Sequence, residues 1–135
     1  MPVVLDASVT AAWILPDEQT PNALQARNLA IGEGALVPAH WWYEVRNTLL
    51  MAERRQRTTA AGIATALASL RMVPIVSRAP TGDASIFELA RRHRLTFYDA
   101  AYLELALRET VALATLDDRL AGAAAAEEVP LVIAR

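Results

Sequence analysis

The chain has 135 residues, no cysteine, 54% hydrophobic residues and a formal net charge of −2. This length predicts one domain over residues 1–135 with a sizeable core, and the missing cysteines exclude a disulfide framework, thiolate metal ligands and cysteine nucleophiles. The N-terminus lacks a basic segment followed by a long apolar stretch, and no run approaches about 18 apolar residues, so we expect no signal peptide, no membrane span and a cytoplasmic location.

Short apolar strands alternate with helices along the whole chain. In chain order we expect a strand at 2–5, a helix at 7–14, a helix at 21–31, a strand at 35–37, a helix at 41–55, a helix from Thr58 or Thr59 to about Leu70, a strand at 72–76, helices at 82–94 and 99–108, a strand at 111–115, a helix at 118–126 and a strand at 131–134. Pro16 ends the first helix, and Pro21 suits the first turn of the second. This alternation predicts a three-layer α/β/α sandwich with a mainly parallel central sheet.

Acidic residues stand at the points where this pattern changes from strand to helix. Asp6 and Asp117 follow two apolar strands, Asp99 opens a predicted helix, and Glu44 lies in the first turns of the apolar helix WWYEVRNTLL. Each aspartate taken alone fits a helix N-cap, because its side chain can accept a backbone N–H bond. Glu44 alone fits a solvated helix residue or a partner of a nearby arginine.

Taken together, these acids predict a cation site. The carboxyl ends of parallel strands meet at one edge of a sheet, which is where such folds bind ligands. Two carboxylates 4 Å apart repel each other by about 4 kcal/mol near a protein surface. Carboxylates gathered there therefore need a cation or raised pKa values, and hard oxygen ligands suit Mg²⁺ or Mn²⁺, ions that bind phosphate oxygens and activate water.

Four segments carry a resemblance to a known family: VVLDASV, YEV, TFYDAAYLELA and ATLDDRL, in this order. Together the chain resembles the PIN domain, and most of all the VapC-type toxins of bacterial and archaeal toxin–antitoxin pairs. The resemblance implies a metal-dependent ribonuclease with one or two Mg²⁺ or Mn²⁺ ions held by Asp6, Glu44, Asp99 and Asp117. Ser8 and Thr115 correspond to hydroxyl residues that help to order such a site. The resemblance also implies an RNA substrate, a cognate antitoxin protein and a homodimer.

The fourth acid and the function itself leave alternatives open. Asp118 directly follows Asp117 and could take its place, although Asp117 is the first carboxylate past the strand and has the family's spacing from Thr115. A PIN-like module that binds a partner with little or no catalysis is the second functional hypothesis. A receiver domain and a P-loop both need a lysine, and all 13 positive charges of this chain are arginines. A phosphatase of the haloacid-dehalogenase type needs an aspartate where Ser8 stands.

The basic and aromatic residues outside the acidic cluster have alternative possible roles. The arginine clusters at residues 54–57 and 91–94 either complement helix C-termini or contact RNA phosphates. Aromatic residues can fill the core, form an interface or stack on bases: Trp13, Trp41, Trp42, Tyr98 and Tyr102. His40 and His93 lack a nucleophile-elbow context, so we expect both to be structural.

Overall fold

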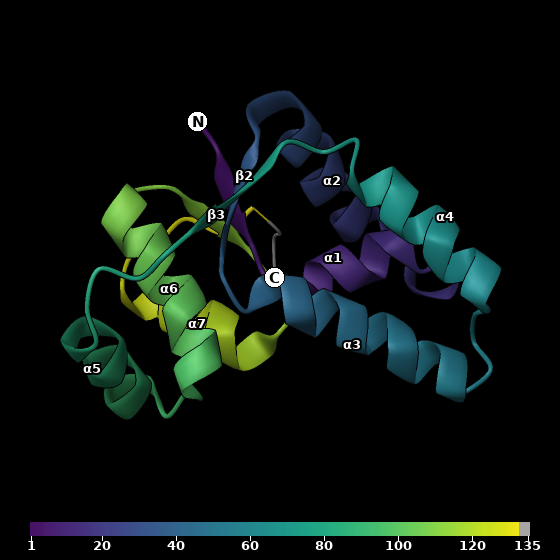
Figure 1. The fold of residues 1–135 in the computed structure, drawn as a ribbon. Coiled ribbons are helices and arrows are strands. Elements are labelled where there is room, and N and C mark those ends of the chain that lie inside the picture. Colours follow the sequence, from purple (N-terminus) through teal and green to yellow (C-terminus); the bar gives the residue numbers. More distant parts are fainter. Residues whose placement is uncertain (133–135) are drawn as a thin grey trace.

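A computed structural model describes residues 1–132 and shows four strands in one parallel sheet (Figure 1). The sheet order is β3-β2-β1-β4, with strands β1 (Val3–Leu5), β2 (Ala35–Pro38), β3 (Ile75–Arg78) and β4 (Ala112–Ala114). The helices are α1 (Ala7–Ile14), the 3₁₀ helix η1 (Pro16–Glu18), α2 (Pro21–Glu33), α3 (Trp41–Arg54), α4 (Ala60–Leu70), α5 (Ala84–His93), α6 (Phe97–Glu109) and α7 (Asp118–Ala126).

The helices form two layers around the sheet. In Figure 1, α1 to α4 lie on one side of the strands and α5 to α7 lie on the other. β1 is buried along its whole length, because a parallel sheet in such a fold is covered on both faces. The predicted three-layer sandwich with a parallel central sheet is therefore confirmed.

The third strand begins at Ile75, three residues later than predicted. The backbone N–H groups of Met72 and Val73 donate to carbonyls in the last turn of α4, each at 3.1 Å, and so close a turn there. The strand starts only after Pro74, which has no N–H to donate. As a result β3 pairs with β2 from Ile75 to Arg78 at one edge of the described sheet.

The predicted last strand lies mostly outside the described residues. Leu131 forms a single parallel bridge with Leu113 of β4, and the N–H of Val132 donates to the Leu113 carbonyl at 3.1 Å. Ile133 and Ala134, the second half of the prediction, are not among residues 1–132. Within those residues no helix has both the length and the apolar character that crossing a membrane requires.

Candidate metal centre

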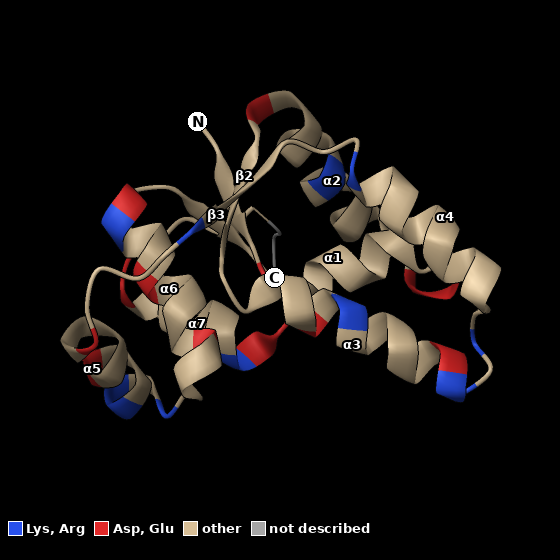
Figure 2. Ribbon diagram, in the orientation of Figure 1, with Lys and Arg blue, Asp and Glu red and all other residues tan. Residues whose placement is uncertain are grey.

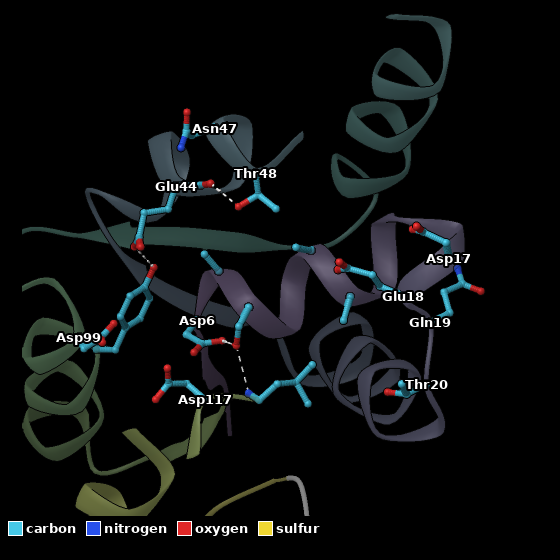
Figure 3. A pocket seen from close by; sticks show the side chains of 16 residues that line it. Asp6, Asp17, Glu18, Gln19, Thr20, Glu44, Asn47, Thr48, Asp99 and Asp117 are labelled. Carbon is cyan, nitrogen blue, oxygen red and sulfur yellow. Dashed lines mark hydrogen bonds between the residues drawn. The ribbon is translucent and has the colours of Figure 1, made fainter. Parts of the chain in front are cut away.

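The carboxyl end of the sheet borders a pocket of about 740 Å³. Four of its lining residues are the acids singled out from the sequence, Asp6, Glu44, Asp99 and Asp117, and they come from four separate parts of the chain (Figure 3). Asp6 and Asp117 meet because they follow β1 and β4, which are neighbours in the sheet. Glu44 and Asp99 reach the same pocket from the first turns of α3 and α6.

Asp6 is buried and holds three hydrogen bonds. Its Oδ1 accepts from the Ser8 hydroxyl at 2.7 Å and from the Val9 N–H at 3.0 Å, and its Oδ2 accepts from the Thr115 hydroxyl. Burial, with a smaller contribution from the charge of Asp117, nevertheless raises the pKa of Asp6 to about 6, because together they outweigh these three bonds. The fold thus keeps a carboxylate where ionisation costs free energy unless a cation is present.

Ser8 and Thr115 orient the Asp6 carboxylate. The Ser8 hydroxyl oxygen accepts the N–H of Leu116 at 3.1 Å, and the Thr115 hydroxyl oxygen accepts the N–H of Asp117 at 3.0 Å. With these acceptor positions occupied by backbone, both hydroxyl protons point to Asp6. Ser8 in α1 and Thr115 after β4 therefore hold the Asp6 carboxylate in place from two directions.

Asp117 has two roles in this structure. Its Oδ1 accepts the N–H of Leu120 at 2.8 Å, so Asp117 is the N-cap of α7 as well as a lining residue of the pocket. Asp118 is the first residue of α7 and does not line the pocket. Capping and pocket lining, considered as alternatives from the sequence, coincide at Asp117 and also at Asp6, which caps α1.

Asp99 is not a helix cap, contrary to one of its predicted roles. Helix α6 begins at Phe97, and the Thr96 hydroxyl caps it by accepting the Asp99 N–H at 3.1 Å. The Asp99 carboxylate does not cap the helix and instead lines the pocket. Its pKa is raised first by partial burial and then by the negative charges of Asp117 and Glu44. The acids therefore lie close enough to repel one another.

Glu44 is held by Tyr102, for which the sequence left a core, interface or stacking role open, and by His40, which was expected to be structural. Its Oε1 accepts the hydroxyl of Tyr102 at 2.7 Å, and His40 Nε2 lies 3.2 Å from the same oxygen. Burial and the charge of Glu44 keep the pKa of Tyr102 above its usual range, so the phenol stays a donor. Burial lowers the pKa of His40, and the Glu44 charge partly opposes this.

Helical spacing could have indicated the residues that were missed. His40 lies four residues before Glu44, Asn47 lies three residues after it, and Tyr102 lies three residues after Asp99. Residues three or four apart share a helix face. Tyr102 and Asn47 line the pocket itself, and His40 contacts it through Glu44.

The donor set of the pocket fits a hydrated hard cation. Within residues 1–132 no three acidic or histidine side chains are already arranged to enclose an ion. Mg²⁺ does not need such a cage, because it keeps several water ligands and binds through one or two carboxylates. Asp17 and Glu18 add two more carboxylates, and none of the described arginines or histidines lines the pocket. These oxygen donors suit Mg²⁺ or Mn²⁺.

Asp17 and Glu18 lie apart from the other acids and are neutralised. Figure 3 shows them beyond the C-terminal end of α1, at the far end of the pocket from Asp6. Arg57 binds both, through Nε to Asp17 at 2.8 Å and through Nη2 to Glu18 at 2.6 Å. The unneutralised charge is therefore concentrated at the sheet edge.

The arginines do not form one large basic face in the view of Figure 2. One cluster lies at the end of α3 and in the loop after it, and the other lies at the end of α5. Arg57 is paired as described, and Arg92 is paired with Glu88 and Glu127. The placement agrees with charges that complement helix C-termini, and RNA contact by the remaining arginines stays a prediction.

Comparison with known proteins agrees with the observed fold and identifies the family of this chain. The family model described as PIN domain matches residues 3–126. The chain is 35% identical over 123 residues to Ribonuclease VapC3 of Mycobacterium tuberculosis, in two strains, which covers 90% of this chain and 86% of the relative. The crystal structure of PAE2754 from Pyrobaculum aerophilum aligns with a TM-score of 0.70 at 22% identity, over 98% of this chain and 84% of that one, and supports the fold. From β1 to the end of α7, then, this chain is a member of the PIN domain family.

Proposed function

We propose that this protein is an endoribonuclease that depends on Mg²⁺ or Mn²⁺ and acts as the toxin of a toxin–antitoxin pair. One observation carries the proposal: four carboxylates from four parts of the chain line a single pocket to which residues 1–132 contribute no cationic side chain. The relationship to a protein named Ribonuclease VapC3, over 90% of this chain, supports RNA as the substrate.

In this proposal Asp6, Glu44, Asp99 and Asp117 hold the metal. A bound divalent ion would supply an activated water and charge stabilisation at the scissile phosphate. Ser8 and Thr115 keep the Asp6 carboxylate in its rotamer, and Tyr102 does the same for Glu44. Such orientation matters because a displacement of about 1 Å at a reacting centre can cost about 100-fold in rate.

The test is cleavage of a mixed RNA sample by the purified protein in Mn²⁺, in EDTA and after an Asp6→Asn substitution. We expect cleavage only by the parent protein in metal. Glu18→Gln is the matched control, because Glu18 lines the same pocket at its far end. We expect this variant to cleave RNA like the parent. Equal cleavage by the parent and Asp6→Asn would contradict the proposal, and absence of any cleavage would favour the partner-binding module.

The same reasoning extends to partners. We propose a homodimer and a cognate antitoxin in the cytoplasm, as the resemblance to VapC-type toxins implies. Exposed aromatic surface supports an interface, because Trp42 is 52% exposed while the adjacent Trp41 is buried. Light scattering at about 20 μM, a concentration above the Kd of ordinary dimers, should give twice the monomer mass. A single monomer mass would contradict the dimer.

A further inference from the structure

A second hollow, of about 330 Å³, adjoins the acidic pocket. It is lined by His40, Tyr43, Glu44, Asn47 and Tyr98, and two of these, Glu44 and Asn47, also line the acidic pocket. The two hollows therefore share a wall on α3. A ligand in the acidic pocket therefore has the second hollow beside it, across this shared wall.

Two tyrosines face this hollow because of their position in the helices. Tyr43 precedes Glu44 on α3, and Tyr98 precedes Asp99 on α6. Consecutive helix residues point about 100° apart, so each tyrosine is turned aside from the acid that follows it. Both rings are open to solvent, since Tyr43 is 72% and Tyr98 is 61% exposed.

The ring of Tyr98 is held in place by aromatic contacts behind it. Its centroid lies 5.3 Å from that of His40, and the His40 ring packs edge-on against Tyr102 at 4.9 Å. Tyr102 is buried and bonded to Glu44. On the α3 side, the ring of Tyr43 packs edge-on against Trp42 at 5.0 Å. Rings oriented in this way offer a face for stacking with little loss of side-chain freedom.

The lining also determines the charge of the group that fits. Glu44 contributes a carboxylate, and no arginine from the described part of the chain lines the hollow, so the site disfavours a phosphate or a carboxylate. Tyrosine faces suit a flat ring, and the Asn47 amide offers both donors and an acceptor for a ring edge. Unpaired RNA bases are recognised by this combination of stacking and edge contacts.

We propose that this hollow binds one nucleobase of the RNA, adjacent to the phosphate in the acidic pocket. The base stacks on Tyr43 or Tyr98, and the Asn47 amide bonds to its edge. This inference rests on the proposed ribonuclease function and adds to it a residue-level basis for choosing the cleavage position. The shared wall of Glu44 and Asn47 favours RNA over an aromatic side chain of a protein partner, which would not need to adjoin the acids.

The experiment uses a short labelled RNA that the protein cleaves at one bond, and matched RNAs that each carry one abasic ribose near that bond. We expect one abasic position to lower kcat/KM about tenfold or more, since stacking of a base on an aromatic ring is commonly that strong. Tyr43→Leu or Tyr98→Leu should lower kcat/KM by a similar factor on the intact RNA and leave it nearly unchanged on that abasic RNA.

Three controls separate stacking from structural damage. Tyr43→Phe and Tyr98→Phe keep the ring and should behave like the parent. Phe87→Leu removes a 45% exposed ring on α5, outside the hollow, and should leave kcat/KM unchanged on both the intact and the abasic RNA. Asn47→Leu should change which base is preferred at the sensitive position. Leucine variants that cleave every RNA like the parent, or that lose equally on intact and abasic RNA, would overturn the inference and assign the hollow to another ligand.

A binding measurement separates this inference from the proposed function. Short single-stranded RNAs, chosen without regard to cleavage and each made intact or with one abasic ribose, are titrated against the Asp6→Asn variant in Mn²⁺, with fluorescence anisotropy as the readout. Abasic discrimination in binding, without cleavage by the parent, would support the base site and contradict the ribonuclease. Cleavage by the parent without any abasic discrimination would contradict the base site alone, and no RNA binding at all would contradict both.

Discussion

At the level of single residues, Asp6 is a carboxylic acid whose ionisation is disfavoured by the fold. Its pKa of about 6 lies above the value of 3.8 for an ordinary aspartate, because burial outweighs three hydrogen bonds. An acid whose pKa is raised by folding adds stability while it is protonated. That contribution is lost as the pH rises from about 4 through about 6.

Asp6→Asn should therefore stabilise the metal-free protein at neutral pH. The difference between the two pKa values corresponds to at most about 3 kcal/mol. We expect a higher Tm for the variant than for the parent in EDTA at pH 7.5, and a smaller difference at pH 4. Thermal melts across this pH range give the answer, and a variant that melts lower than the parent at pH 7.5 would show that hydrogen bonding by the ionised carboxylate dominates.

Thr115 provides a second test at the residue scale. Thr115→Val removes the hydroxyl that donates to Asp6 and accepts the Asp117 N–H. Loss of such an orienting contact typically weakens metal binding by about 10- to 100-fold. We expect the Mn²⁺ concentration that gives half of the thermal stabilisation to rise by about tenfold. Thr115→Ser keeps the hydroxyl and should bind Mn²⁺ like the parent; equal values for all three proteins would contradict an orienting role.

At the scale of secondary-structure elements, the junction between β4 and α7 determines which acid faces the pocket. β4 ends at Ala114 and α7 begins at Asp118, so Asp117 lies between them as the N-cap. Neighbouring residues in the first turn point in different directions. The pocket consequently includes Asp117 and not Asp118, and the role of Asp117 as the fourth metal ligand stays a prediction.

Asp117→Asn should lower metal-dependent cleavage by about tenfold or more, equivalent to about 1.4 kcal/mol of transition-state stabilisation. Asparagine is also a good N-cap, so we expect the free energy of unfolding to change little. Asp118→Asn is the matched control and should leave the rate nearly unchanged. Both rates are measured at saturating Mg²⁺. Should Asp118→Asn be the more damaging change, the fourth acid would be assigned to the wrong residue.

At the scale of the whole molecule, folding brings mutually repelling carboxylates to one edge of the sheet. The pKa of Asp6 is raised by Asp117, and that of Asp99 by Asp117 and Glu44. A cation that binds among these groups binds the folded state and not the unfolded chain. Metal binding should therefore stabilise the fold as a whole.

Millimolar Mn²⁺ should raise the Tm of the parent protein. A ligand at 100 times its Kd adds about 2.7 kcal/mol to the free energy of unfolding. The same addition should have little effect on Asp6→Asn, and NaCl at equal ionic strength is the control for a general salt effect. An unchanged Tm of the parent in Mn²⁺ would count against a metal centre in this pocket.

The order of strands and helices, the parallel sheet and the family could all be predicted from the amino-acid sequence. Periodicity and short apolar runs carry this information locally, and a carboxylate that follows a parallel strand must lie at the carboxyl edge of the sheet. The placement of Asp6 and Asp117 at one pocket could be predicted for this reason. Boundaries set by turns, such as the start of β3 at Ile75, depended on backbone bonds that the residue pattern does not reveal.

Which side chains surround the acids could be seen only in the folded protein. The contacts of Thr115 with Asp6 and of Tyr102 with Glu44 join residues 109 and 58 positions apart, and Arg57 meets Asp17 across 40 positions. His40 and Tyr98 likewise become neighbours only when α6 packs beside the start of α3. Such contacts depend on how the layers pack, and packing is determined by the complementary shapes of many buried side chains together rather than by any local pattern.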